Sequence, residues 1–166
     1  MKRLALGILL VSLFALSAPA LADVDVSKLQ LAGDLTLAQA QKVLAGALEF
    51  AVKQGVPMNI TVIDAGGNLK AFCRMDGAFL GSIDVSMKKA KTARLFNMSS
   101  AELGAASQPG QELFGIEVTN GGLVIFGGGE LLRDENGVIV GAIGVSGGSV
   151  AEDTNVAKAG VAALNK

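Results

Sequence analysis

The sequence ELLRDENGVIVGAIGV, residues 130–145, says most about how this chain folds. Two apolar runs, Glu130 to Arg133 and Val138 to Val145, flank a turn-forming Asp-Glu-Asn-Gly at residues 134–137. An Asn-Gly pair between two such runs is a strong local signal of a β-hairpin. The second run contains Gly141 and Gly144, and glycine in a strand lets a helix or a flat ligand approach closely. We therefore predict an antiparallel hairpin, one face of which a helix or a flat ligand contacts closely.

Upstream of this hairpin, a second pair of apolar runs predicts another one. Met58 to Asp64 is rich in Ile, Val and Thr, and Leu69 to Arg74 resumes the strand pattern after a Gly-rich turn. A shorter apolar run, Leu123 to Phe126, predicts one more strand. The sequence thus predicts five strands in all.

Helical spacing of apolar residues marks the segments between these strands. The first helix covers residues 40–52, with Asp34 or Thr36 as its N-cap. We expect a second helix from Ile83 to about Met98, capped by Ser82. A short helical turn at residues 100–106 and a last helix at 150–164 follow. This order predicts the α/β (α+β) class, with helices packed on a mostly antiparallel sheet.

Residues 1–22 have the pattern of a secretory signal peptide. Lys2 and Arg3 precede an apolar run from Leu4 to Leu16, and Ala20-Leu21-Ala22 fits a cleavage site. The run is shorter than the roughly 20 residues that a membrane-spanning helix needs. We expect cleavage to leave residues 23–166 as one domain, periplasmic or secreted, without a membrane span. Loss of the two leader cations leaves 12 basic against 15 acidic residues, a net charge of −3.

The composition excludes several classes of function. The 166 residues include no His and no Tyr, and a single cysteine, Cys73. Without His there can be no His-zinc site, no Ser-His or Cys-His dyad and no His-ligated haem. Nearly balanced charge argues against a nucleic-acid partner, and no glycine cluster continues into a nucleotide-binding P-loop. We expect neither zinc nor nucleotide, and we interpret Cys73 as a small apolar residue.

Two charged segments are candidates for ligand binding. Arg74 stands where a strand gives way to a helix, and its guanidinium could hold a ligand carboxylate that Asp76 helps to orient. The same two residues could instead form an ion pair that braces the turn. In the helix that follows, Lys88, Lys91 and Arg94 share one face, which suits an anion-attracting rim or a solvated surface.

Several motifs, taken in order, carry a resemblance to a known family. They are IDAGGNL at residues 63–69, RMDGA at 74–78, KAKTA at 89–93, GVIVGAIGVSG at 137–147, and Asp153 with Ala159-Gly160 in the last helix. With this set the chain resembles the GlcG/HbpS-like haem-binding family, which includes the C-terminal domain of PduO-type proteins. The resemblance covers about residues 35–164.

The resemblance implies a profilin-like three-layer sandwich, in which helices flank a five-stranded antiparallel sheet. It also implies homo-oligomers built from dimers and a small anionic, hydrophobic ligand, which in some members is haem. No catalytic residue is implied. The metal ligand is left open: we interpret the methionines at 58, 75, 87 and 98 as core residues, and a Met or Cys could still ligate a haem iron because His is absent. The residues implied to bind the ligand are Arg74, Met75, Asp76, Lys89, Thr92, Gly128 and Gly144.

Two features of the chain depart from the family pattern. No His can stand near an iron atom, and Glu130 stands where the family often has a proline, so that its charge could repel a carboxylate. We expect a small-ligand-binding protein whose ligand is haem or a related tetrapyrrole. One alternative is an enzyme that degrades haem or acts on a small organic acid, with Asp76 or Glu130 as general base. Another is an oligomeric module that binds a partner.

Overall fold

The structure, a computed structural model, describes residues 33–165. The predicted signal peptide lies outside the described residues, so its cleavage stays a prediction. Within the described part of the chain, no helix combines the length and the hydropathy needed to cross a bilayer.

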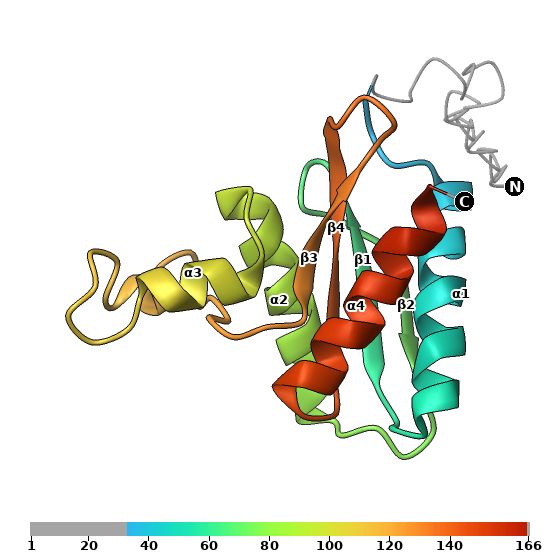
Figure 1. Cartoon of the computed structure of the whole chain (residues 1–166), viewed down its shortest axis with the longest axis horizontal. Helices are drawn as coiled ribbons and strands as arrows, with labels where there is room; N and C mark the ends of the chain where they lie inside the picture. Colours follow the sequence, from blue (N-terminus) through green and yellow to red (C-terminus); the bar gives the residue numbers. More distant parts are fainter. Residues whose placement is uncertain (1–32, 166) are drawn as a thin grey trace, which may run out of the picture. The chain divides into compact units, whose positions relative to one another are not determined.

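The described residues form one antiparallel sheet of four strands (Figure 1). Its strands run in the order β2-β1-β4-β3, so the first strand of one hairpin pairs with the last strand of the other. Both predicted hairpins are confirmed, since β1 pairs with β2 and β3 with β4. The strands are β1 (Asn59–Asp64), β2 (Leu69–Arg74), β3 (Gly129–Arg133) and β4 (Ile139–Ser146).

The prediction of a fifth strand is wrong for residues 123–126. This segment pairs with no strand of the described sheet. Its backbone contacts residues of two helices instead. The Val124 amide donates to the Thr92 hydroxyl at 3.0 Å. The Ile125 carbonyl lies against Gly104, where a Cβ atom would clash with it. The segment therefore connects the helices to β3 without joining the sheet.

Helices cover both faces of the sheet, which confirms the α+β class. α1 (Leu37–Gln54) and α4 (Val150–Leu164) pack together on one face, and α2 (Gly81–Phe96) packs on the other (Figure 1). The short α3 (Ser100–Ala106) and the 3-10 helix η3 (Ile116–Val118) follow α2. The larger apolar core lies between the sheet and the α1–α4 layer. Its most enclosed large side chains are Leu35, Val43, Met58, Ile60, Val62, Leu132, Ile143, Val145 and Val156.

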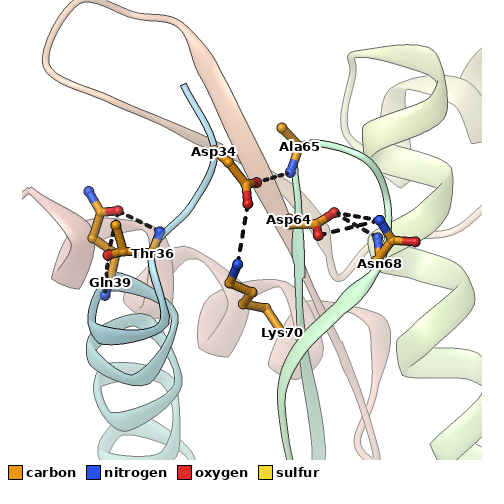
Figure 2. A network of polar contacts seen from close by, with 7 residues as sticks. All are labelled: Asp34, Thr36, Gln39, Asp64, Ala65, Asn68 and Lys70. Atoms are coloured by element: carbon orange, nitrogen blue, oxygen red, sulfur yellow. Dashed lines mark hydrogen bonds and ion pairs between the residues drawn. The ribbon is translucent and has the colours of Figure 1, made fainter. Parts of the chain in front are cut away.

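The start of α1 is fixed by polar contacts that Figure 2 shows. Of the two predicted caps, Thr36 is the N-cap: its hydroxyl accepts from the Gln39 amide at 3.2 Å, and the Gln39 side chain accepts from the Thr36 amide. Asp34 instead reaches the first hairpin, where it accepts from the Ala65 amide at 3.1 Å and pairs with Lys70 at 3.2 Å. These contacts tie the entry of α1 to the β1–β2 turn.

The helix that carries the basic residues begins earlier than predicted. α2 starts at Gly81 with Leu80 as its N-cap and no side-chain cap, so the expectation that Ser82 caps it is wrong. The Ser82 amide instead donates to the Phe79 carbonyl, within a turn that leads into the helix. α2 ends at Phe96 because Asn97 adopts a left-handed conformation, with φ of 55°.

The start of α1 lies close to the end of α4. The Lys42 ammonium, in the second turn of α1, donates to the carbonyl of Leu164 at the end of α4, with an N–O distance of 3.5 Å. Figure 1 shows α1 and α4 side by side over the same face of the sheet.

Candidate functional site

The predicted ligand-binding residues separate into an exposed group and a buried group. Arg74, the last residue of β2, and Asp76 just after it are exposed. Neither side chain makes a hydrogen bond or ion pair within residues 33–165. Met75 turns the other way, and its sulfur accepts from the Met58 amide at 3.3 Å. The Arg74 guanidinium is thus open to solvent at the end of an edge strand.

Lys89 belongs to the buried group. Its side chain is fully enclosed, and its Nζ lies 2.6 Å from Asp153 Oδ2 and donates to the Val145 carbonyl at 2.9 Å. The ring of Phe126 lies over the same ammonium, with 4.8 Å from Nζ to the ring centroid. Asp153 in turn accepts from the Gly148 amide at 3.0 Å. The cation therefore joins α2, β4 and α4 inside the fold.

Burial and pairing act on the pKa of Lys89 in opposite directions. Desolvation favours the neutral amine and lowers the pKa, and the Asp153 carboxylate partly offsets this. A buried ion pair of this kind holds elements in register, because either charge alone would be left without compensation. The role of Lys89 as a ligand cation stays a prediction, and it would require this pair to open.

The remaining predicted residues lie where two segments of the fold pack closely against each other. A Cβ atom on Gly144 would clash with the Ser86 carbonyl of α2, which accounts for the glycine by helix packing. Gly128, with φ of 110°, leaves room for the Lys89 ammonium, which would lie 2.9 Å from an added Cβ. Thr92 is buried and holds the Val124 amide. Protein atoms fill the space beside both glycines, so the sheet surface at Gly144 leaves no room for a flat ligand.

A hollow of about 210 Å³ opens between the first hairpin and α2. We call it the hairpin hollow. Leu69 of β2 is 56% exposed at this hollow, and Met87 and Lys91 lie one helical turn apart on its α2 wall. Its lining residues are Thr61, Ile63, Gly67, Asn68, Leu69, Met87 and Lys91.

Arg74 lies on the same face of β2 as this hollow. Phe72 pairs with Thr61 and Arg74 with Asn59, and the Thr61 hydroxyl meets Ser86 of α2 at 2.8 Å. Because side chains two residues apart in a strand share a face, Phe72 and Arg74 point to the α2 side of the sheet. α2 packs over β1, β4 and β3, which leaves this side of β2 largely uncovered. The hairpin hollow and this side of β2 together form an apolar strip, with Lys91 near one end and Arg74 near the other.

A larger hollow of about 520 Å³ lies along the opposite edge of the sheet, at β3. We call it the edge hollow. Glu130, the residue that departs from the family pattern, lines it and is half-buried. Desolvation raises the pKa of Glu130, the nearby Lys158 ammonium lowers it, and the Glu102 carboxylate raises it further. The lining residues are Asn97, Met98, Ser99, Ala101, Glu102, Glu130, Leu131, Arg133, Thr154 and Lys158.

Sequence reasoning identified parts of these hollows without joining them. Lys91 was predicted to lie on a basic helix face, and Glu130 was singled out as a departure from the family. Leu69 gave no functional signal, and Met87 was interpreted as a core residue rather than a metal ligand, because apolar residues at such positions usually belong to a core. Within the described residues, no cluster of His, Cys, Asp and Glu could hold a metal ion.

The chain is similar to several known proteins. The model of the family described as "Haem degrading protein HbpS-like" matches residues 35–162. An uncharacterised 15.0 kDa protein of Citrobacter freundii is 38% identical over 80% of this chain and 94% of its own length. The crystal structure of the Klebsiella pneumoniae protein ORFY has a TM-score of 0.77 at 38% identity, covering 81% of this chain and 93% of that one. A crystal structure described as a PduOC–haem complex has a TM-score of 0.74 at 35% identity, covering 78% and 94%.

Proposed function

Because the chain belongs to the HbpS-like family, we propose that it binds haem or a related tetrapyrrole through the strip formed by the hairpin hollow and the α2-facing side of β2. The PduOC domain, which shares the fold at 35% identity, forms a complex with haem. The observation that carries the proposal is the combination of an apolar surface that α2 does not cover with two cations that form no ion pair within residues 33–165. The exposed Leu69 and the partly exposed Phe72 supply the surface, and Arg74 and Lys91 supply the cations.

The strip suits an amphiphilic, flat dianion. The hairpin hollow, at about 210 Å³, is smaller than the range of roughly 300–1,000 Å³ usual for enclosed ligand sites, so it would take one edge of a macrocycle. The rest of the ring would lie along Phe72. Carboxylates at the rim would then reach the guanidinium of Arg74 or the ammonium of Lys91, where charge-assisted hydrogen bonds hold them.

The described residues also fit the chemistry of a haem iron without His. Haem, when bound, would supply an iron atom, which a thioether sulfur can ligate. Met87 brings a thioether to the wall of the hairpin hollow, one turn from Lys91. Met75 is less available, because its sulfur already accepts from the Met58 amide. Met87 is therefore the residue that we expect to face an iron.

The test is a haemin titration of the purified protein, followed by the Soret band. We expect a shifted Soret band, a different band position in Met87→Leu, and affinity weakened about twofold to fivefold by Arg74→Ala, the range for a partly exposed ion pair. Arg133→Ala, an exposed arginine at the end of the opposite edge strand, is the matched control and should leave binding unchanged. A Soret band that does not shift in the parent protein would overturn the proposal. Slow loss of the band after binding would instead indicate that the protein also degrades haem.

We propose in addition that the protein is exported and assembles into homo-oligomers. The signal-peptide pattern at residues 1–22 supports export, and mass spectrometry of the secreted product should give a chain that begins at Asp23. Several large apolar side chains are exposed, among them Phe79 at 70%, Phe114 at 64% and Val118 at 81%, which is the kind of surface that subunits cover. Light scattering coupled to size-exclusion chromatography tests the second point, and a monomer at all concentrations would refute it.

A further inference from the structure

Charged side chains of both signs surround the edge hollow. Glu102 of α3 and Glu130 of β3 contribute carboxylates, and Arg133 of β3 and Lys158 of α4 contribute cations. Within residues 33–165, no ion pair shorter than 4 Å involves any of the four. One oxygen of Glu102 accepts from the Ser99 amide, and Arg133 donates to the Gly137 carbonyl at 2.9 Å. Charges of both signs thus line one cavity without forming a close ion pair among the described residues.

The backbone spreads these charges along the hollow. Glu130 and Arg133 are three residues apart in β3, which corresponds to about 10 Å along a strand. Glu130 pairs with Ile143, whose side chain reaches Gly160 of α4, so the Glu130 carboxyl also lies on the α4 side of the sheet. Lys158 lies one helical turn after Thr154, which lines the same wall. The volume of about 520 Å³ is that of a small-molecule site.

We propose that the edge hollow binds a small zwitterion, a molecule of amino-acid or dipeptide size that carries both an ammonium and a carboxylate. Its ammonium binds Glu130 and the second carboxylate oxygen of Glu102, and its carboxylate binds Lys158 and Arg133. A ligand with one charge would face an uncompensated like charge on part of the wall, and a neutral ligand would desolvate four ions without replacing their hydration. Glu130 has the largest part in selectivity, because it is the half-buried member of the set.

This site is separate from the one proposed for haem. Arg74 and the hairpin hollow lie at the β2 edge, whereas Glu130 and Arg133 belong to β3 at the other edge of the four-stranded sheet. Three inter-strand spacings of about 4.8 Å separate the two edge strands. The two proposals therefore stand or fall independently.

The test is isothermal titration of the full protein with glycylglycine at pH 7, beside two analogues that each lack one charge. N-acetylglycine keeps the carboxylate, and glycinamide keeps the ammonium. We expect glycylglycine to bind at least tenfold more tightly than either analogue. Glu130→Gln and Lys158→Met should each weaken its binding at least fivefold, while Glu135→Gln, in the β3–β4 turn outside the hollow, should have no effect.

Three results would overturn the proposal: no heat of binding from glycylglycine, equal affinity for all three compounds, or unchanged affinity in both hollow variants. Circular dichroism confirms that each variant is folded before titration. If Glu130→Gln does not fold, Lys158→Met decides the question, because Lys158 is exposed and makes no side-chain hydrogen bond within the described residues.

Discussion

The ammonium of Lys89 and the carboxylate of Asp153 lie 2.6 Å apart in the interior, and they join two helices from opposite faces of the sheet. Lys89 belongs to α2 and Asp153 to the first turn of α4. The lysine side chain passes the end of the sheet where β4 finishes, next to Gly128, and donates to the Val145 carbonyl on its way. The pair therefore links all three layers.

Removing one member of this pair should be costly. Lys89→Met leaves the Asp153 carboxylate buried without a compensating charge, and breaking a buried pair in this way costs about 3–5 kcal/mol of unfolding free energy. Urea denaturation measures the loss. Lys53→Met, which breaks the exposed pair with Glu49, should cost less than about 1 kcal/mol. Equal effects of the two substitutions would refute the structural role of Lys89.

Gly144 should tolerate no side chain. In Gly144→Ala the new methyl group meets the Ser86 carbonyl and the Ala90 amide of α2, so the helix must move away from the sheet. Overpacking of this kind costs about 1–3 kcal/mol, which thermal unfolding would register as a lower Tm. Gly81→Ala, at the first residue of α2 with open space around it, should be neutral or mildly stabilising. A neutral Gly144→Ala would argue that α2 packs less closely than described.

Stability should depend on pH through Glu130. Its pKa in the folded state is raised above the usual 4.5, so the folded state holds the proton more strongly than the unfolded state does. The resulting penalty is absent below the unfolded pKa, grows as pH rises, and is complete above the folded pKa. Glu130→Gln should therefore raise the unfolding free energy at pH 7 and change it little at pH 4. The opposite pattern, with the larger gain in acid, would contradict the raised pKa.

The capping box of α1 should contribute measurably to stability. Thr36→Ala removes the hydroxyl that accepts from the Gln39 amide, and loss of such a cap costs about 1 kcal/mol. Thr36→Ser keeps the acceptor and should retain most of the stability. Chemical denaturation of the two variants side by side tests the cap, and equal losses would mean that the methyl group, not the hydroxyl, matters.

The hairpins were predictable from sequence because their signals are local. The turn residues 134–137 and the apolar alternation on either side specify β3 and β4 without reference to the rest of the chain. The segment 123–126 has an equally apolar sequence. Its Val124 amide nevertheless donates to the Thr92 hydroxyl, and its backbone contacts Gly104 instead of a strand. Whether an apolar run becomes a strand thus depended on partners that are distant in sequence.

The candidate site was less accessible to sequence reasoning for the same reason. Lys89 and Asp153 are 64 residues apart, and nothing local to either distinguishes a buried pair from a surface cation. Arg74, by contrast, was predicted to end a strand and to be available for a ligand, and the structure places it there with its side chain exposed. The hairpin hollow needed Leu69 and Met87 to come together from two elements.

The short distance between Lys42 and the Leu164 carbonyl has a consequence for how the chain could be rewired. A linker from residue 165 to residue 34 would close the polypeptide into a ring on the side of the sheet that α1 and α4 cover. New termini could then be opened in the exposed loop around Gly110, which belongs to no strand. Such a circular permutant would keep every strand neighbour and would place the β3–β4 hairpin ahead of the β1–β2 hairpin in the chain, with α4 and α1 joined between them.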